Sequence, residues 1–389
     1  MLNIGKNIKT GEYIYIDGSR SRAVLVCGKR GSGKSYTLGV IIEELQETEN
    51  ILIIVVDPMG IYYPMCQPNH EQERELWEWG LSSKEMKVKL LVPGDPERRY
   101  GGADVITEME KRGVRFQPLK INPSDLSPDG WCELFNLGIS DVMGIGLYRA
   151  VQNISRRRKR NFFIPDIINE IEMDGRIADR TREALLNRLE MAIDWDVFSD
   201  AYHEVWEMFD PGVVNIIDLS VLDPGRHGLR NLVVSIIARD MFRKRTVARR
   251  KEELGLISTM PRVWMFIDEA QLFAPSGRTT LSKEALIRWV KEGRQPGLSL
   301  AISSQQPSAI DSEVLSQCDI ILCHKLTNVD DIQAVNRLSH DYMASELKTY
   351  IRKLKRIGEA VMVDDERESV SMVQIRPRRS QHGGGESKK

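Results

Sequence analysis

The sequence contains no apolar stretch long enough to cross a membrane. A membrane-spanning helix needs about 20 consecutive apolar residues, whereas the most apolar run here covers only residues 51–56. The mean hydropathy is −0.32, and residues 1–6 lack the apolar segment of a secretory signal. We therefore expect a cytoplasmic protein that has no membrane partner.

Cysteine is scarce, and net charge is nearly absent. The 5 cysteines form no Cys-x-x-Cys pair, and the 6 histidines show no metal-ligand spacing. This pattern argues against a disulfide framework and a zinc site, and it fits reduced thiols. With 55 basic and 56 acidic residues, the net charge is −1. Composition therefore neither indicates nor excludes a nucleic-acid partner, and any such contact would need a local basic surface.

A glycine-rich turn follows the apolar run at residues 23–27. The octet Gly-Lys-Arg-Gly-Ser-Gly-Lys-Ser occupies residues 28–35, and Leu or Ile then recurs at 38, 41, 42 and 45, the spacing of one helix face. Strand, glycine-rich turn and helix form the context in which G-x-x-x-x-G-K-[ST] binds phosphate. The sequence therefore predicts an α/β P-loop NTPase.

The residue types in this turn suit a nucleotide and its metal ion. Glycines let the backbone curl so that its N–H groups converge on phosphate. Lys34 would reach the β- and γ-phosphates of ATP, and Ser35 would ligate Mg²⁺. The residues predicted to bind nucleotide are Gly28, Gly31, Ser32, Gly33, Lys34, Ser35 and Tyr36.

Polar side chains end three later apolar runs. Asp268 and Glu269 follow residues 263–267, and we expect the aspartate to hold Mg²⁺ and the glutamate to deprotonate the attacking water. Gln305 follows residues 298–303 and could bond the γ-phosphate or the water. Asp57 follows residues 51–56; it could face a ligand at the strand ends or cap its own loop. These residues together predict ATP hydrolysis.

The strand and helix patterns divide the chain into four segments. Residues 1–137 and 211–375 carry the predicted strands and form two parts of one ATPase core, while strand signals are missing from 138–210, which we expect to be a helical insertion lobe. Residues 376–389, which include three consecutive glycines, are predicted to be a disordered tail. We also expect a strand at 119–122 and a helix at 283–292 capped by Ser282.

Several segments together resemble the HerA/FtsK superfamily, and HerA-like ATPases most of all. The similarity extends from about residue 20 to 376. Its most specific part is Ser-Gln-Gln-Pro-Ser at 304–308 with Leu-Ser-Gln-Cys at 315–318. The other matching segments are 57–60, 218–220, 268–270, 293–297 and 358–360.

The resemblance implies a RecA-like ATPase with a mostly parallel central sheet. Such proteins assemble as hexameric rings that drive double-stranded DNA through a central channel, and HerA proteins act with a nuclease partner. Three features depart from the family: Gln306 stands where an arginine is usual, Ile61 where an acidic residue is frequent, and too few residues precede Gly28 for the β-barrel of cellular HerA proteins.

Arginines are the expected contacts to a neighbouring subunit and to DNA. Ring ATPases commonly use an arginine from the adjacent subunit to stabilise the transferred phosphate. We assign this role to Arg294, in the turn that resembles the superfamily, although Arg278, Arg288 and Arg337 are alternatives. The basic runs at 156–160 and 243–251 are candidates for DNA contact, or they form solvated faces.

Three functions compete at this stage. The first is a DNA-translocating motor, and the second is an ATP-driven switch or assembly factor that acts on a protein partner without moving DNA. The third is a P-loop kinase, which would more often show a short chain and no glutamate beside the aspartate. A GTPase would need a guanine-reading lysine, which the string Thr-Asn-Val-Asp at 327–330 lacks.

Overall fold

The computed structural model describes residues 1–158, 161–223, 228–256, 260–338 and 341–384. Its strands are β1 (Leu2–Asn7), β2 (Tyr13–Ile16), β3 (Ala23–Cys27), β4 (Ile51–Asp57), β5 (Val88–Pro93), β6 (Val114–Leu119), β7 (Val214–Asp218), β8 (Arg262–Ile267), β9 (Leu298–Ser304), β10 (Ile320–Cys323), β11 (Glu359–Asp364) and β12 (Ser369–Ile375).

The α-helices are α1 (Lys34–Gln46), α2 (Glu73–Glu78), α3 (Pro96–Tyr100), α4 (Ala103–Lys111), α5 (Pro128–Leu134), α6 (Val142–Arg158), α7 (Ile164–Met173), α8 (Asp179–Asp194), α9 (Leu229–Glu253), α10 (Leu281–Glu292), α11 (Ser312–Leu315), α12 (Val329–Asn336) and α13 (Asp341–Lys353). Short 3-10 turns lie at Tyr63–Cys66, Pro123–Asp125, Val205–Met208, Ala270–Leu272 and Pro307–Ala309.

One 12-stranded sheet organises the chain, in the order β2-β1-β12-β11-β10-β3-β9-β8-β4-β7-β5-β6. Strands from β10 to β6 in this order pair in parallel, whereas β2, β1, β12 and β11 are antiparallel to their neighbours. The predicted α/β class with a mostly parallel sheet is therefore confirmed. Since the parallel strands share one direction, the residues that follow β3, β8 and β9 lie together at the carboxyl ends of these strands.

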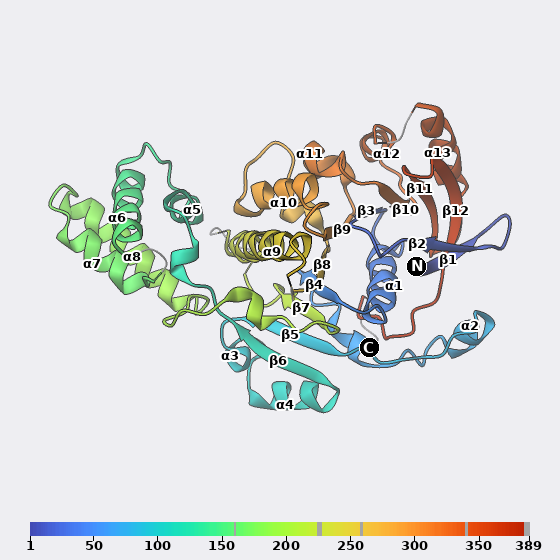
Figure 1. Ribbon diagram of the computed structural model, residues 1–389, viewed down its shortest axis with the longest axis horizontal. Helices are drawn as coiled ribbons and strands as arrows, with labels where there is room; N and C mark the ends of the chain where they lie inside the picture. Colours follow the sequence, from blue (N-terminus) through green and yellow to red (C-terminus); the bar gives the residue numbers. More distant parts are fainter. Residues whose placement is uncertain (159–160, 224–227, 257–259, 339–340, 385–389) are drawn as a thin grey trace.

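Each face of the sheet is covered by its own apolar core. Alternate residues of a strand point to opposite faces, so in β4 Ile53 and Val55 pack on the side of α1, while Ile54 and Val56 pack on the side of α9 and α10. The parallel strands are therefore apolar throughout, as expected for a sheet buried on both faces. Figure 1 shows α9 and α10 together on one side of the central strands.

The segment at 138–210 contains α6, α7 and α8, which project away from the sheet (Figure 1). Leu147, Ile167 and Leu185 are fully buried between these helices. Among the described residues of this range there is no named strand, and Phe198 makes only an isolated bridge to Ile121. The lobe and its boundaries as a separate unit stay a prediction.

Two expected elements differ in detail. The predicted strand at 119–122 is wrong, because β6 runs from Val114 and ends at Leu119. Pro118 concealed this strand, and it is tolerated because β6 lies at the sheet edge, where the missing N–H is not needed by a further strand. Helix α10 is capped by Thr280 and not by Ser282, since the Thr280 side chain accepts from Lys283 N.

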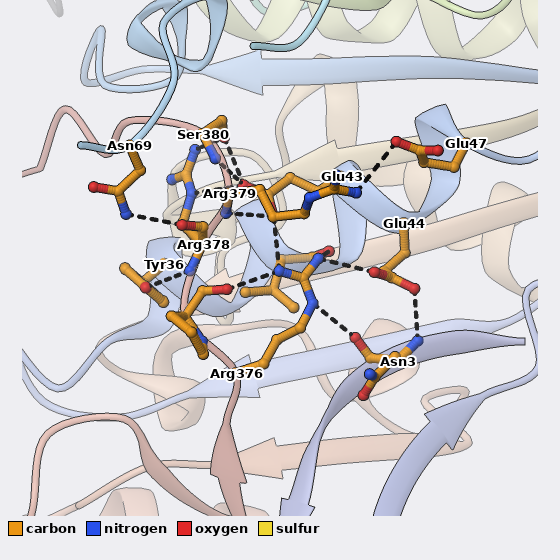
Figure 2. A network of polar contacts seen from close by, with 12 residues as sticks. Asn3, Tyr36, Glu43, Glu44, Glu47, Asn69, Arg376, Arg378, Arg379 and Ser380 are labelled. Atoms are coloured by element: carbon orange, nitrogen blue, oxygen red, sulfur yellow. Dashed lines mark hydrogen bonds and ion pairs between the residues drawn. The ribbon is translucent and has the colours of Figure 1, made fainter. Parts of the chain in front are cut away.

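The predicted disordered tail is also wrong for most of its length. Residues 376–384 run along α1, and the side chains of Arg376 and Arg378 are fully buried. Arg376 donates to Glu43 at 2.9 Å and to Glu44 at 3.0 Å, as Figure 2 shows. These pairs join residues more than three hundred positions apart, so patterns of neighbouring residues in the sequence could not predict them. Residues 385–389 lie outside the described part.

Among the residues that the structure describes, no helix is both long enough and apolar enough to cross a lipid bilayer.

Candidate functional site

The glycine-rich turn lies where β3 ends and α1 begins, and its shape requires glycine. A Cβ on Gly28 would lie 2.5 Å from Ser32 Oγ and 2.6 Å from the Cβ of His324. Gly33 has a φ of 106°, a left-handed conformation that side chains disfavour. The predicted strand, turn and helix are thus all present.

Three observations show that this turn fits a phosphate group. Helix α1 begins at Lys34 without a side-chain cap, so no side chain occupies the place at its first N–H groups where an anion would bind. The Oγ of Ser32 is buried without a hydrogen-bond partner. The Nζ of Lys34 contacts the carbonyl oxygen of Lys29 at 3.2 Å. Burial lowers the pKa of Lys34, and the nearby charges of Glu269 and Asp268 oppose that shift.

Asp268 joins the end of β8 to the start of α1. Its Oδ2 accepts hydrogen bonds from Ser35 Oγ at 2.7 Å and from the hydroxyl of Tyr62 at 3.2 Å. Its Oδ1 accepts from Ser303 Oγ and from the N–H of Glu269 at 3.0 Å. The structure therefore brings together a hydroxyl and a carboxylate, which are oxygen groups that suit Mg²⁺.

Glu269 lies beside this pair in an unusual backbone conformation. Its φ is 51° and its ψ is 53°, the left-handed region that few residues other than glycine adopt. Strain of this kind costs about 1–3 kcal/mol and clusters at functional sites. One carboxylate oxygen accepts from Gln305 Nε2, and the other accepts from Gln271 Nε2 at 2.7 Å. The structure thus places Gln305 against Glu269.

Asp57 caps its own loop. Its carboxylate accepts from the N–H groups of Met59 at 3.1 Å, Gly60 at 2.8 Å and Tyr62 at 2.9 Å. Burial raises the pKa of Asp57 to about 7, and the neighbouring Asp218 adds to the shift. Of the two alternatives for Asp57, the loop cap is the one that the contacts support.

Tyr36 faces the C-terminal segment. Its hydroxyl donates to Gln72 Oε1 at 2.7 Å and accepts from Arg378 N at 2.5 Å. Its ring lies edge-on to His382, with 5.5 Å between the ring centroids. A role of this side chain in nucleotide binding stays a prediction.

Sequence reasoning did not identify Gln271, Ser303 or His324. The buried His324 ring contacts Thr37 Oγ1 at 2.9 Å and the carbonyl oxygen of Glu359 at 2.9 Å, so it links α1 to β11. Burial lowers its pKa to about 4. A signal existed for Ser303, because small polar residues end the otherwise apolar strand β9. No local signal marked His324.

Arg294 lies just before the amino end of β9, at the opposite end of the parallel strands from the nucleotide turn. It precedes β9, whereas Gln305 follows it, and the 7 residues of β9 span about 20 Å. The side chain is exposed, and its backbone carbonyl accepts from Ser21 Oγ at 3.2 Å. Arg294 is therefore separated from the residues gathered around Asp268, and a role of this side chain in hydrolysis stays a prediction.

One residue of the second basic run supports the turn that carries Arg294. Arg245 is buried, with 2% of its surface exposed, and its Nε donates to the carbonyl oxygen of Pro296 at 2.7 Å. Its guanidinium also donates to the carbonyl oxygen of Met260 at 2.7 Å and to Glu252 at 2.9 Å. Arg245 is thus an internal anchor and no part of a basic surface.

Most other cations of the two basic runs form ion pairs. In the first run, Arg157 pairs with Glu170 and Arg158 with Asp166, and residues 159–160 lie outside the described part. In the second run the pairs are Arg243–Asp240, Lys244–Glu204 and Arg249 with Glu252 and Glu253. Arg156 and Arg250 are exposed. These pairs favour the reading of both runs as solvated faces.

Comparison with known proteins places the chain in a family. Residues 2–241 match the family described as "Helicase HerA, central domain". A probable helicase from Methanocaldococcus jannaschii is 25% identical over 359 residues, which cover 88% of this chain and 60% of that protein. The DNA double-strand break repair helicase HerA of Pyrococcus furiosus is 23% identical over 376 residues, or 91% and 65% of the two chains. The chain thus spans about two thirds or less of these relatives.

Solved structures show the same fold at low sequence identity. VirB4 of Thermoanaerobacter pseudethanolicus has a TM-score of 0.61 with 14% identity and covers 96% of both chains. The plasmid coupling protein TrwB, solved with a non-hydrolysable ATP analogue, has a TM-score of 0.52 with 13% identity and covers 95% of this chain and 88% of that one. With the nucleotide-fitting turn and the family match, the conclusion is that this chain belongs to the HerA helicase central-domain family and is a P-loop ATPase of the HerA type.

Proposed function

We propose that the protein is an ATP-hydrolysing ring motor that translocates double-stranded DNA. The proposal rests on one observation in a chain of the HerA family. At the carboxyl ends of the central strands, Ser35 contacts Asp268 and Gln305 contacts the adjacent Glu269. The relatives named as DNA repair helicases support DNA as the substrate.

The residues at this edge have complementary tasks in hydrolysis. Lys34 and the N–H groups at the start of α1 bind the phosphates, and Glu269 holds the attacking water and accepts its proton. The water oxygen forms a bond to the γ-phosphorus, while the bond from that phosphorus to the β–γ bridging oxygen breaks, and ADP and phosphate leave. Gln305, which touches Glu269, reports this event to β9 and the segment that follows it.

A magnesium ion fits the same group of residues. Ser35 and Asp268 would hold it, the serine directly and the aspartate through its water shell, and when bound it would neutralise charge on the β- and γ-phosphates. The hydrogen bond of 2.7 Å between these two side chains keeps their oxygens together.

The ring supplies the residue that the site of one subunit lacks. Arg294 lies at the amino ends of the parallel strands, on an exposed turn. The buried Arg245 supports this turn through its hydrogen bond to the carbonyl oxygen of Pro296. In a ring this turn would face the phosphates of the next subunit, where a guanidinium stabilises the charge of the transferred group. A hexamer is the ring size that the family resemblance implies, and a nuclease is a further partner.

A protein-directed switch is the second candidate function. The ion pairs within both basic runs favour it, because they leave few of those cations free for DNA phosphates. In that case ATP binding and hydrolysis would change the affinity for a protein partner, and duplex DNA would leave turnover unchanged.

DNA-stimulated ATP turnover separates the two candidates. We expect duplex DNA to raise the rate of hydrolysis, and the oligomeric mass to reach that of a ring with ATP and duplex DNA present. Affinity for DNA should fall steeply with salt and depend little on sequence. Replacing Arg156, Arg157 and Arg158 with serine should reduce the salt slope if the first run touches DNA, whereas an unchanged slope would assign it to the surface.

A further inference from the structure

Glu269 is held from both sides by glutamine side chains. Gln305 Nε2 donates to Oε1 and Gln271 Nε2 donates to Oε2, so both oxygens of the carboxylate have a fixed partner. Gln305 follows β9 and Gln271 lies in the turn after β8, so the two donors come from neighbouring strands. A carboxylate oxygen has a second lone pair, so each oxygen can still accept from water.

The amide of Gln271 is itself held in one orientation. Its Oε1 accepts from Ser304 Oγ at 2.7 Å, and that hydroxyl accepts from the N–H of Gln306 at 2.9 Å. With the oxygen committed to Ser304, the NH₂ group must face Glu269. Gln271 is half-buried and Ser304 fully buried, which shields this chain of bonds from competing water.

The same serine connects this chain of bonds to the nucleotide turn. The carbonyl oxygen of Ser304 accepts from the N–H of Gly28 at 3.3 Å. A displacement of the turn would therefore pass through Ser304 and Gln271 to the carboxylate of Glu269. The left-handed backbone at Glu269 fixes the direction in which its side chain leaves the main chain. The amides of Gln271 and Gln305 fix the orientation of the carboxylate at its end.

We propose that Gln271 is a positioning residue for ATP hydrolysis, which orients the Glu269 carboxylate toward the attacking water and links that orientation to the nucleotide turn through Ser304. This inference rests on the proposed function, in which Glu269 accepts the proton. It assigns a task to Gln271, whose side chain contacts Glu269 and Ser304.

Gln271→Met tests the proposal because it keeps the side-chain length and removes the amide, with its carbonyl oxygen and its NH₂ group. We expect kcat to fall about 10- to 100-fold, with the KM for ATP and the affinity for a non-hydrolysable ATP analogue within about twofold of wild type. Gln333→Met is the matched control, because Gln333 is an exposed glutamine on α12, and its turnover should stay normal.

A double-variant cycle separates positioning from general damage. If Gln271 acts through Glu269, adding Gln271→Met to Glu269→Gln should change single-turnover hydrolysis by less than about twofold. Ser304→Ala, which frees the Gln271 amide, should lower kcat less than Gln271→Met does, and should add nothing to it. This variant also serves if Gln271→Met does not fold.

The outcomes distinguish this inference from the function on which it rests. Normal turnover in Gln271→Met beside an inactive Glu269→Gln would overturn the inference alone. So would an equally large loss from Gln271→Met in the wild-type and Glu269→Gln backgrounds. Full turnover in Glu269→Gln would overturn the proton-accepting role of Glu269, and with it the task assigned to Gln271.

Discussion

Arg245 Nε donates a hydrogen bond of 2.7 Å to the carbonyl oxygen of Pro296, and so ties the buried face of α9 to the turn that carries Arg294. The same guanidinium pairs with Glu252. Removing the guanidinium would leave the buried carbonyl oxygens of Pro296 and Met260 without this donor. The turn therefore depends on a residue whose sequence context suggested a surface cation.

Replacing Arg245 with methionine should destabilise the protein and loosen this turn. We expect the free energy of unfolding to fall by about 2 kcal/mol, measured by urea denaturation. Arg250→Met, an exposed arginine of the same helix, should change it by less than about 0.5 kcal/mol. Equal stability of the two variants would show that the contact to Pro296 contributes nothing.

Replacing Glu269 with glutamine should separate nucleotide binding from hydrolysis. The amide cannot accept a proton from water, so turnover should drop by about 10²-fold or more, while the affinity for ATP stays close to wild type. Fluorescent-nucleotide titration and phosphate release measure the two quantities. Equal turnover in variant and wild type would remove Glu269 from the mechanism.

Mixing two inactive variants should reveal whether Arg294 acts across a subunit interface. Arg294→Ala keeps its own Glu269, and Glu269→Gln keeps its own Arg294, so a mixed ring contains some interfaces that have every part. We expect ATP turnover to return in part when the two are combined.

The mixed sample needs proof that the two variants share one ring, for example by pull-down of differently tagged chains. A co-assembled mixture as inactive as its components would contradict the assignment in trans. Arg74→Ala on α2 is a suitable control, since the exposed Arg74 pairs with Glu78 one helical turn away, and its turnover should match wild type.

The protein should become less stable as the pH is lowered from 7 to 4, because His324 is buried in its neutral form. Its native pKa is lowered to about 4 from an ordinary 6.5, mainly by burial, with a smaller effect of the Lys34 charge. The unfolded chain therefore binds the proton first as pH falls. This contribution is complete above about pH 6.5 and is lost toward pH 4, by about 3 kcal/mol.

Urea denaturation between pH 7 and pH 4 checks this expectation. The His324→Gln variant should show a flatter dependence than wild type, because glutamine does not titrate, and His70→Gln, at an exposed position, should follow wild type. Parallel curves for wild type and His324→Gln would contradict a neutral His324 in the folded protein.

The nucleotide turn could be predicted from sequence because every signal for it is local. β3, the glycines and α1 are consecutive, so their periodicity and residue types describe the whole feature. Asp268, Glu269 and Gln305 were also placed at strand ends by local patterns. Their meeting depends on β9 lying between β3 and β8, an order that strand periodicity could not supply.

The remaining features depend on contacts between distant segments. Arg376 pairs with Glu43 across 333 positions, which orders a tail whose composition predicted disorder. Gln271 gains its partner Ser304 only when β8 and β9 pair, and His324 gains Thr37 only when β10 lies beside β3. Asp57 required the geometry of its loop before the cap could be distinguished from a ligand site.

Displacement of a third DNA strand from a duplex would report directly whether the protein moves along double-stranded DNA. A motor that moves along double-stranded DNA strips a triplex-forming strand without separating the duplex beneath it. For a DNA-translocating motor we expect displacement that requires ATP. It should be absent in Lys34→Ala, which loses the cation aimed at the phosphates. ATP hydrolysis by the wild-type protein on this DNA, with the third strand still bound, would contradict this expectation.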